Sequence, residues 1–547
     1  MVDVAEFTGV QAVVAWLRQR GVRRLVADSR QAGPGDAFVA WPGFPGDGRR
    51  HVADALGRGA QACLVEADGW QATPWSSEWA DMAEGAGLER VAAVWGLKAL
   101  AGEMASEFCG HPSHGMEVVA ITGTNGKTST AWWLAQALAA VGRPCGLAGT
   151  LGLGMPGPAH EPLALLQPTG LTTPDPITLQ AQLQRWHADG VRACALEASS
   201  IGLVEHRLAG ARLAVAVFTN LTQDHLDYHA SMAAYWDAKR SLFDWPGLRA
   251  AVVHVDDAHG QQLATGLAER ADLVLWTVSL LPDGGAMAER PRHLWVQELT
   301  ATPNGMRLVV AEGGQRRTLD VPLVGRYNAA NLLGVLGSLR ALGLGLGAAV
   351  DACGKLSAVP GRMEPINPLL GAAADEQALP LVLVDYAHTP DAVAQALQAL
   401  QPLAAARGGR LHAIVGCGGD RDATKRPLMA AAAEAHAHRV CLTSDNPRSE
   451  DPLAILAAMQ AGLRHPGAVR TVADRAQAIA SQVALALPPD VVLIAGKGHE
   501  TTQEVAGVRH PFSDQLHALQ ALRACLAGAV SPTPFQSSGP QVAERSA

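Results

Sequence analysis

A glycine-rich segment beginning at Gly123 carries the residues best suited to bind phosphate. Its sequence is Gly123-Thr124-Asn125-Gly126-Lys127-Thr128-Ser129. The two glycines allow a tight turn whose backbone N–H groups point at an anion, and Lys127 supplies a charge for the outer phosphates. The Thr128 hydroxyl is suited to bind Mg²⁺. The segment therefore predicts a nucleotide-phosphate site to which every residue from Gly123 to Ser129 contributes.

This segment is shorter than the usual phosphate-binding loop. Ile121 stands where the first glycine normally lies, so only G-x-x-G-K-T remains. The alternative is a glycine-rich turn that binds nothing. The Lys-Thr pair at the correct positions and the apolar run before the turn favour the phosphate site. We expect a strand over Val118 to Ile121 and a helix over Thr130 to Val141.

Polar side chains follow two later apolar runs. Glu197 comes directly after Ala193 to Leu196, and His225 lies in the polar segment after Leu213 to Phe218. Ligands of open parallel sheets bind at the carboxyl ends of the strands. Glu197 is therefore a candidate Mg²⁺ ligand. On residue type alone, His225 is either a metal ligand or a hydrogen-bonded loop histidine.

Length and composition predict a multidomain globular protein. The chain has 547 residues, of which 48% are hydrophobic and 17% are charged, and its net charge is -8. The negative charge argues against a nucleic-acid or membrane partner. Eight scattered cysteines without C-x-x-C spacing suit free thiols, and the N-terminus lacks a signal-peptide pattern. We therefore expect a cytoplasmic protein that acts as a monomer.

The pattern along the chain predicts an α/β fold with three domains. A small N-terminal α/β domain is expected over residues 1-90, and a central P-loop ATPase-like domain with a parallel sheet over 91-358. A Rossmann-like doubly wound domain is expected over 359-527, because strands and helices alternate there. Residues 528-547 are rich in Ser, Pro and Gln and predict a disordered tail. A Pro- and Gly-rich loop is expected over Leu153 to Leu171.

Polar strings follow the strands predicted for the third domain. They are D-Y-A-H-T-P from Asp385, G-C-G-G-D-R-D from Gly416, S-D-N-P-R from Ser444 and G-K-G-H-E from Gly496. Together with G-T-N-G-K-T-S from Gly123, they resemble the Mur ligases, the cytoplasmic ATP-dependent amide ligases of peptidoglycan precursor synthesis. The resemblance covers nearly the whole chain, and its motifs occur in the family's order.

The string Asp445-Asn446-Pro447-Arg448 resembles the signature of one branch of this family. Members of that branch add meso-diaminopimelate to UDP-N-acetylmuramoyl-L-alanyl-D-glutamate, whereas lysine-adding members typically differ at the position of Arg448. The resemblance implies ATP and Mg²⁺ as cofactors. It also implies that the D-glutamate γ-carboxylate takes the γ-phosphoryl group of ATP before the amine attacks. Lys127, with Mg²⁺ on Thr128 and Glu197, would neutralise the charge between these anions.

The resemblance implies a functional role for Lys239 that its position in the sequence alone does not predict. A lysine in the helix expected over Ser231 to Phe243 would by default face solvent. In the family, however, the matching lysine is carbamylated, and the carbamate would hold a second Mg²⁺ together with His225. The amine must be neutral to react with CO₂, so a lowered pKa is expected for Lys239. The implied catalytic residues are thus Lys127, Lys239 and His225.

The resemblance also implies three sets of substrate contacts. For the muramoyl dipeptide they are Ser29, Phe44, Thr172, Thr173, Ser200, Glu205 and Arg207. For diaminopimelate they are Arg426, Asp445, Asn446, Arg448, Gly496 and Glu500, with Arg448 clamping the distal carboxylate. For the nucleotide they are Asn328, Arg362, Asp385 and His388, and domain closure about a hinge near 358-362 would bring the third domain to the nucleotide.

Two positions depart from the family pattern. Glu205 stands where glutamine is expected, and Ile201 stands where histidine is common. An ionised glutamate cannot donate a hydrogen bond, so a substrate contact of Glu205 is in question.

Several alternatives stay open at this point. A lysine-adding relative or a folylpolyglutamate synthase would share the loop, although Arg448 and the full N-terminal domain speak against both. A P-loop switch that uses ATP only to change shape is a further possibility. Arg448 could also pair with Glu450 or Asp451 at the surface instead of binding substrate.

Overall fold

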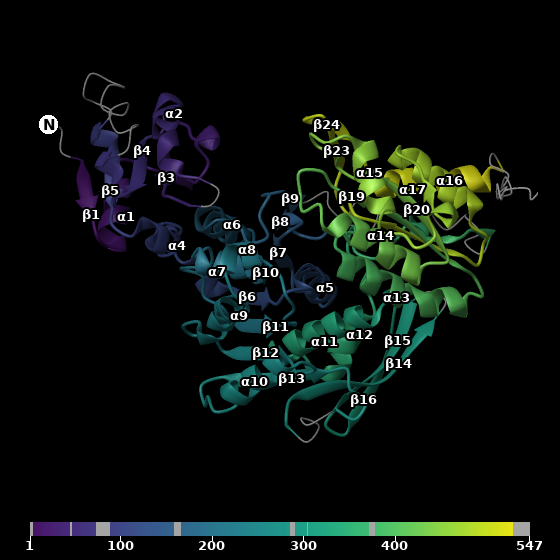
Figure 1. The fold of residues 1–547 in the computed structure, drawn as a ribbon. Helices are drawn as coiled ribbons and strands as arrows, with labels where there is room; N and C mark the ends of the chain where they lie inside the picture. Colours follow the sequence, from purple (N-terminus) through teal and green to yellow (C-terminus); the bar gives the residue numbers. More distant parts are fainter. Residues whose placement is uncertain are drawn as a thin grey trace, which may run out of the picture. The chain divides into compact units, whose positions relative to one another are not determined.

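The structure is a computed structural model, and it describes residues 4-43, 46-72, 88-157, 166-284, 290-302, 305-370 and 378-528. The chain forms two compact units. The first unit contains residues 1-300, 307-321 and 326-357, and the second contains 301-306, 322-325 and 358-547. Figure 1 labels most of the helices and many of the strands of both units. Among the described residues, no helix is long and apolar enough to cross a membrane.

The first unit begins with a parallel five-stranded sheet, here called the N-terminal sheet, in the order β1-β5-β4-β3-β2. Its strands are β1 Ala5–Phe7, β2 Arg24–Val26, β3 Asp36–Ala40, β4 Ala62–Glu66 and β5 Val91–Val94, and its helices are α1 Val10–Gln19, α2 Val52–Gly57 and α4 Leu97–Phe108. The sheet includes β5, which lies beyond the boundary predicted at residue 90. The division into three domains stays a prediction.

The central sheet of the first unit has eleven strands, in the order β16-β15-β14-β13-β12-β11-β6-β10-β7-β8-β9. The strands are β6 Glu117–Thr122, β7 Cys145–Gly149, β8 Gly152–Gly154, β9 Leu166–Gln167, β10 Ala193–Glu197, β11 Val215–Phe218, β12 Ala250–His254, β13 Val274–Ser279, β14 His293–Thr302, β15 Gly305–Glu312 and β16 Gln315–Val321. The loop predicted over Leu153 to Leu171 thus contributes two short antiparallel strands in its described part.

The helices of the central region are α5 Lys127–Ala140, α6 Pro176–Ala188, α7 Ser200–Val204, α8 Leu226–His229, α9 Met232–Arg240, α10 Ala258–Leu267, α11 Arg326–Ala341 and α12 Leu346–Cys353. Helix α5 is buried along most of its length and packs against α11 and α12. A helix this apolar has to be covered on all sides. This packing fixes the amino end of α5 next to the sheet.

The strand order of the central sheet places three carboxyl ends side by side. β6 lies between β10 and β11, and all three are parallel. The chain leaves β6 through α5 and returns at β7, on the far side of β10, so the order reverses here. Such a reversal opens a crevice at the carboxyl edge of a sheet, which is where ligands bind.

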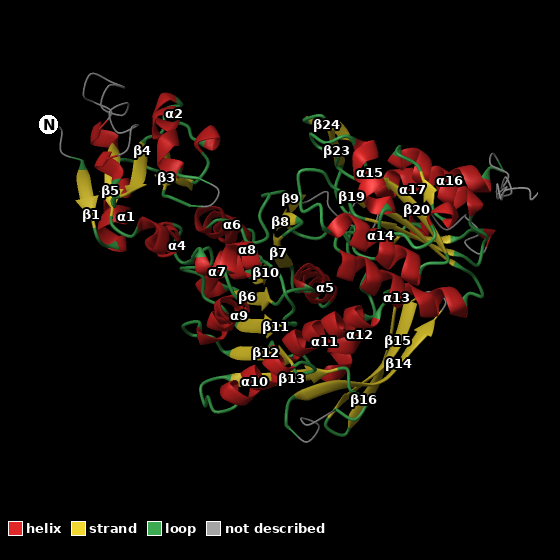
Figure 2. Ribbon diagram, in the orientation of Figure 1, coloured by secondary structure: helices red, strands yellow, loops and turns green. Residues whose placement is uncertain are grey.

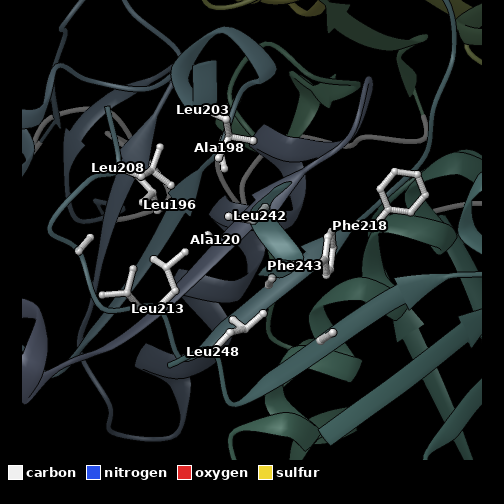
Figure 3. Close-up of a cluster of buried hydrophobic side chains, with 14 of the residues drawn as sticks. Ala120, Leu196, Ala198, Leu203, Leu208, Leu213, Phe218, Leu242, Phe243 and Leu248 are labelled. Atoms are coloured by element: carbon white, nitrogen blue, oxygen red, sulfur yellow. The ribbon is translucent and has the colours of Figure 1, made fainter. Parts of the chain in front are cut away.

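Figure 3 shows the apolar cluster beneath this edge. Its side chains come from β6, β10 and β11 and from the segments that follow them, among them Ala120, Leu196, Phe218 and Phe243. Each of these four is at most 1% exposed. The dense packing holds the strand ends in one arrangement, as a binding edge requires.

The second unit contains a six-stranded sheet, the C-terminal sheet, in the order β17-β18-β22-β19-β20-β21. Its strands are β17 Glu364–Pro365, β18 Leu381–Asp385, β19 Leu411–Cys417, β20 Arg439–Ser444, β21 Arg470–Thr471 and β22 Val491–Ala495, and a hairpin of β23 Thr502–Val505 and β24 Val508–Pro511 follows. All are parallel except β17 and the hairpin. The predicted strands and the mixed α/β fold class are confirmed.

Five helices accompany the C-terminal sheet, and Figure 2 shows them in red beside its yellow strands. They are α13 Pro390–Ala406, α14 Lys425–His436, α15 Pro452–Gln460, α16 Arg475–Leu485 and α17 Asp514–Leu526. A buried ion pair at 2.6 Å joins Arg475 of α16 to Asp514 of α17. The tail predicted from residue 528 lies, from residue 529 on, outside the described residues.

Candidate active site and substrate cleft

The predicted phosphate-binding segment forms the turn between β6 and α5. Gly126 lies in the left-handed region with φ 83° and directly precedes the first residue of α5. The Lys127 ammonium donates to the carbonyl oxygens of Gly123, at 2.9 Å, and Thr124, at 2.8 Å. The Lys127 side chain thus folds back onto the turn at the amino end of α5. The positive end of the helix dipole and the lysine charge both favour binding of an anion there.

Neither glycine of the turn tolerates a side chain. A Cβ at Gly126 would overlap the Asn331 side chain, and a Cβ at Gly123 would overlap the Thr219 hydroxyl. Asn331 lies on α11, three residues after Asn328, and its amide donates to the Asn328 Oδ1 at 3.3 Å. Asn331 and Thr219 therefore shape the turn, although the sequence analysis singled out neither. The three-residue spacing of two asparagines on one helix face is the signal that points to Asn331.

Thr128 and Glu197 meet as expected for a shared ligand set. The Thr128 hydroxyl donates to Glu197 Oε2 at 2.9 Å. The other carboxylate oxygen, Oε1, accepts from the Thr150 backbone N–H at 2.8 Å, and the Thr150 hydroxyl bonds to Thr172. Glu197 is only 1% exposed. The carboxylate is thus held by donors at the edge of the turn.

This donor set fits Mg²⁺, which binds through one or two carboxylates, hydroxyls, waters and substrate phosphates and seldom through a full protein cage. No cluster of three or more His, Cys, Asp or Glu side chains with metal-site geometry occurs within the described ranges. A phosphate group and water would therefore have to complete the coordination.

Lys239 is buried beside the phosphate turn. Its side chain is 1% exposed, and its Nζ donates to the Gly123 carbonyl at 2.7 Å and lies 4.3 Å from the centre of the Tyr235 ring. Burial, and after it the nearby Lys127 charge, lower the Lys239 pKa to about 6, and the Asp224 charge opposes this shift. The predicted lowering of this pKa is confirmed.

His225 also lies near Tyr235. Its ring centre is 6.2 Å from that of Tyr235, and its Nε2 is 3.5 Å from Asp224 Oδ2. The residue has φ 52°, an uncommon conformation for a non-glycine residue, and it precedes α8. The Tyr235 hydroxyl donates to the Thr124 Oγ1 at 3.1 Å. Tyr235 therefore links His225 and Lys239 to the phosphate turn.

A cleft of about 630 Å³ opens in the first unit between the N-terminal sheet and the β8-β9 and α6 region. Its wall contains Asp28, Arg30, Gly46, Glu205 and Arg207. The Ser29 hydroxyl, next to this wall, donates to Asp54 Oδ2 at 2.9 Å. Phe44, predicted at this site, lies outside the described residues.

The remaining predicted dipeptide contacts lie between the cleft and the phosphate turn. The Thr173 hydroxyl donates to the Glu197 carbonyl at 2.8 Å, and Thr172 bonds to Thr150. The Ser200 hydroxyl is hydrogen-bonded to His229 Nε2 at 2.9 Å. Thr172 and Thr173 thus extend the Glu197 network toward the cleft.

Glu205 and Arg207 follow helix α7. The Glu205 carboxylate accepts from the Tyr228 hydroxyl at 2.5 Å and pairs with the Lys98 ammonium at 2.8 Å. Burial opposes ionisation of Glu205, but Lys98 and Tyr228 outweigh it and lower the pKa of the carboxyl group. Arg207 donates instead to the Thr173 carbonyl at 3.1 Å. The sequence analysis did not single out Lys98, which lies 107 residues before Glu205.

In the second unit, Asp385 ends β18 and accepts from the backbone N–H groups of Met363, at 2.7 Å, and Ala387, at 2.9 Å. Burial raises the pKa of Asp385, although the Arg362 charge opposes this. The Arg362 guanidinium lies 4.6 Å from the centre of the Tyr386 ring. The His388 ring is in edge contact with Tyr386, and burial lowers its pKa. Arg362, Asp385 and His388 are therefore neighbours, and their contact with a nucleotide stays a prediction.

The expected diaminopimelate contacts also gather in the second unit. The Arg448 guanidinium donates to the Gly419 carbonyl at 2.6 Å, and the residue has φ 54°. Glu450 pairs instead with Arg426, at 2.7 Å. Among the described residues, Arg448 forms no ion pair with Glu450 or Asp451, so the surface pairing considered for it is wrong.

A buried network joins the other members of this set. Asn446 Nδ2 donates to Glu500 Oε2 at 2.8 Å, and the Lys497 ammonium donates to the same oxygen at 2.9 Å and to Asn446 Oδ1 at 3.0 Å. A Cβ at Gly496, which has φ 123°, would overlap the Asp445 carboxylate. Lys497 is fully buried and was not among the predicted contacts, although it lies inside the G-K-G-H-E string.

Comparison with known proteins matches both units to one family. The Mur ligase middle domain matches residues 121-339, and the Mur ligase glutamate ligase domain matches residues 361-498. A UDP-N-acetylmuramoyl-L-alanyl-D-glutamate–2,6-diaminopimelate ligase of Acidovorax sp. (strain JS42) is 52% identical over 522 residues, covering 94% of this chain and 97% of the relative.

Solved structures give the same picture. A structure of a UDP-N-acetylmuramoyl-L-alanyl-D-glutamate–2,6-diaminopimelate ligase is 33% identical, with a TM-score of 0.62, and covers 92% of this chain and 95% of its own. MurF ligase from Thermotoga maritima, solved in complex with ADP, shares the fold at 18% identity, with a TM-score of 0.58, and covers 93% of this chain and 99% of its own.

Proposed function

The chain belongs to the Mur ligase family, and we propose that it joins diaminopimelate to UDP-N-acetylmuramoyl-L-alanyl-D-glutamate at the expense of ATP. The enzyme is an ATP-dependent acid–amino-acid ligase of peptidoglycan precursor synthesis. The new amide joins the γ-carboxylate of D-glutamate to an amine of meso-diaminopimelate. We include a cytoplasmic location and a monomeric state in the proposal.

The phosphate turn binds ATP and activates the carboxylate. Backbone N–H groups at the start of α5 and the Lys127 charge receive the phosphates, and Lys127 remains beside the transferring group. Mg²⁺ on Thr128 and Glu197 would neutralise charge between two approaching anions. The γ-phosphoryl group then passes to the glutamate γ-carboxylate and gives an acyl phosphate.

Lys239 supports this step as a carbamate. With a pKa of about 6, its amine is about nine-tenths neutral at pH 7, whereas an ordinary lysine is almost wholly protonated. A neutral amine can attack CO₂, lose a proton and become an anionic carbamate. The carbamate oxygen and the His225 ring nitrogen would then be available to hold a second Mg²⁺ near the phosphate turn.

The second unit selects the amine substrate. Arg448 clamps the distal carboxylate of diaminopimelate, and Asp445, Glu500 and the Gly496 carbonyl accept hydrogen bonds from the distal ammonium. Arg426 binds the carboxylate at the reacting centre after exchanging its present partner, Glu450. Asn446 and Lys497 hold Glu500 in place. L-lysine lacks the distal carboxylate and would leave Arg448 unsatisfied, so it is a poor substrate.

The cleft of the first unit binds the UDP-muramoyl dipeptide. Asp28, Arg30 and the residues around Gly46 offer charged groups and backbone donors to the nucleotide and sugar, while Arg207 faces the dipeptide. Thr172 and Thr173 connect this cleft to Glu197. Asn328, Arg362, Asp385 and His388 contact the nucleotide once the hinge near 358-362 closes.

One observation carries the proposal most strongly. A buried lysine that forms no ion pair among the described residues lies against the carbonyl of a phosphate-binding turn that also carries a threonine–glutamate pair. A protein that bound ATP only to change shape would have no use for a second buried amine at this position. In addition, Glu450, the carboxylate nearest to Arg448 in sequence, forms its ion pair with Arg426 and not with Arg448.

The test is phosphate release from MgATP in the presence of UDP-N-acetylmuramoyl-L-alanyl-D-glutamate with meso-diaminopimelate, with L-lysine or with no amino acid. The proposal predicts release that needs diaminopimelate and yields the tripeptide. Release that requires L-lysine would keep the ligase but overturn the amine specificity. Release indifferent to both amino acids would favour an ATP-driven switch.

A further inference from the structure

The ion pair between Lys98 and Glu205 links two parts of the first unit that are far apart in sequence. Lys98 lies in the first turn of α4, and Glu205 follows the last residue of α7. The Lys98 ammonium lies 2.8 Å from Glu205 Oε2, and the two side chains are 33% and 12% exposed. A pair this poorly solvated is screened little by salt.

The backbone holds Lys98 at this place. The Glu66 carboxylate, at the end of β4, accepts from the backbone N–H groups of Gly96, at 2.9 Å, and Lys98, at 3.3 Å. One turn further along α4, Gly102 packs so closely on Ala209 that a Cβ at Gly102 would overlap the Ala209 carbonyl. Residues four apart share a helix face, so Lys98 and Gly102 meet the segment after α7 together.

Both oxygens of Glu205 are occupied. Oε2 pairs with Lys98, and Oε1 accepts from the Tyr228 hydroxyl at 2.5 Å. Glu205 and Arg207 both line the cleft, whereas Lys98 and Tyr228 are not among its described lining residues. Within the described part of the chain, no ion pair joins Glu205 to Arg207, which donates to the Thr173 carbonyl. Two residues that are not among the described cleft lining thus hold the carboxylate, although its charge still acts on Arg207.

This arrangement matters because the bound substrate is an anion. The dipeptide end carries two carboxylates, so a bare glutamate in the wall would repel it and would compete with it for Arg207. Lys98 neutralises Glu205, and Tyr228 fixes its direction. Arg207 then keeps its charge for the substrate.

We propose that Lys98 and Tyr228 are positioning residues that turn the Glu205 carboxylate away from Arg207, which leaves Arg207 to bind a carboxylate of the dipeptide. This inference rests on the proposed function, because it concerns how the same cleft recognises the UDP-muramoyl dipeptide. It assigns to Glu205 a role in shaping the cleft and not in contacting substrate. An ionised glutamate, which only accepts hydrogen bonds, thereby stands in the cleft wall without repelling its ligand.

The test is calorimetric binding of UDP-N-acetylmuramoyl-L-alanyl-D-glutamate to the full chain without ATP or diaminopimelate. Lys98→Met removes the charge at similar side-chain size, and we expect the Kd to rise about tenfold to hundredfold. Glu205→Gln alone should change the Kd by less than about threefold, because no uncompensated negative charge remains. Tyr228→Phe should weaken binding less than Lys98→Met does.

The double variant Lys98→Met, Glu205→Gln tests whether Lys98 acts by positioning and neutralising Glu205 or only by supporting the fold. With no glutamate to neutralise, its Kd should return to within about threefold of the wild-type value. Arg307→Gln, which breaks the exposed Arg307–Asp320 pair, serves as the matched control and should leave the Kd unchanged. KM values for ATP and diaminopimelate should be the same in all variants.

Two results would overturn the inference. One is wild-type affinity in Lys98→Met, and the other is a double variant as weak as Lys98→Met. Both leave the proposed function intact provided that the wild-type chain binds the UDP-muramoyl dipeptide. Failure of the wild-type chain to bind that compound would instead overturn the proposed function itself.

Discussion

Lys239 in the first unit and Lys497 in the second are equally buried but have very different partners. Lys239 is 1% exposed and meets a carbonyl oxygen and the face of a tyrosine ring, with the Lys127 cation nearby. Lys497 is 0% exposed and meets the Glu500 carboxylate at 2.9 Å and the Asn446 side-chain oxygen at 3.0 Å. Within the described part of the chain, Lys239 forms no ion pair and only the Asp224 charge favours its protonated form, whereas Lys497 is paired with a carboxylate and hydrogen-bonded.

The difference shows that partners, and not burial alone, decide what a buried lysine does. A buried amine without a counter-charge gives up its proton, and a neutral amine is a nucleophile. A buried ammonium with a carboxylate and an amide oxygen remains a charge and orients its partners. We therefore assign Lys239 to chemistry and Lys497 to the shape of the amino-acid site.

Replacement of Lys239 should have the largest effect on activity. Lys239→Ala removes the group that becomes the carbamate, and we expect kcat to fall about a thousandfold. Short carboxylates such as acetate should restore part of the rate, because they can occupy the space of the carbamate. The measurement is phosphate release with and without added carboxylate. A fully active variant would remove Lys239 from the chemistry.

Replacement of Lys497 should instead act on stability. Lys497→Met leaves Glu500 and Asn446 without their shared donor, and we expect the free energy of unfolding to fall by about 3 kcal/mol. Chemical denaturation measures this loss, and the double variant Lys497→Met, Glu500→Gln should recover part of it. The distinction between Lys239 and Lys497 would be wrong if acetate restored the activity of Lys497→Met. It would also be wrong if Lys497→Met were as stable as the wild type.

Replacement of Arg448 tests whether the second unit binds the amine substrate. Arg448→Ala removes the clamp for the distal carboxylate, and we expect the KM for diaminopimelate to rise about a hundredfold while the KM for ATP stays constant. Steady-state kinetics with each substrate varied in turn give both constants. Equal losses for the two substrates would mean that Arg448 only supports the fold.

The pH dependence of stability gives a separate test of the Lys239 assignment. The pKa of Lys239 is about 6 in the folded protein and 10.5 unperturbed, so between these values the unfolded chain binds one more proton. The free energy of unfolding should therefore rise with pH over this range. Lys239→Met should lack this rise and melt a few degrees higher than the wild type near pH 6, with the two curves converging toward pH 10.

Thermal melts in CO₂-free buffer test this directly, since carbamylation would otherwise add a negative charge. A wild-type protein whose stability does not vary with pH relative to Lys239→Met would mean that the folded lysine keeps its proton.

Much of the fold and part of the site could be predicted from local sequence. The apolar run before Gly123 and the Lys-Thr pair after Gly126 define a strand, a turn and a helix, and the structure has all three. Glu197 was predictable because it ends a buried strand of a parallel sheet. The lowered pKa of Lys239 followed from the chemistry that the family resemblance required, not from its neighbours in sequence.

Contacts between distant segments could not be predicted in this way. Asn331, which lies 205 residues after Gly126 on helix α11, leaves no room for a side chain at Gly126. Lys98, on helix α4, forms an ion pair with Glu205. Nothing in the residues next to Glu205 indicates that Lys98 is its partner, because tertiary packing alone brings α4 to the segment after α7. Likewise, Glu450 pairs with Arg426, which lies 24 residues before it, and not with Arg448, which lies two residues before it.

The central claim is that the glutamate carboxylate is phosphorylated before the amide forms. It is tested by supplying UDP-N-acetylmuramoyl-L-alanyl-D-glutamate with ¹⁸O in the D-glutamate γ-carboxylate, together with MgATP and meso-diaminopimelate, and measuring the released phosphate by mass spectrometry. Acyl-phosphate chemistry transfers one labelled oxygen to each phosphate. Phosphate without label, formed while the tripeptide accumulates, would contradict the mechanism.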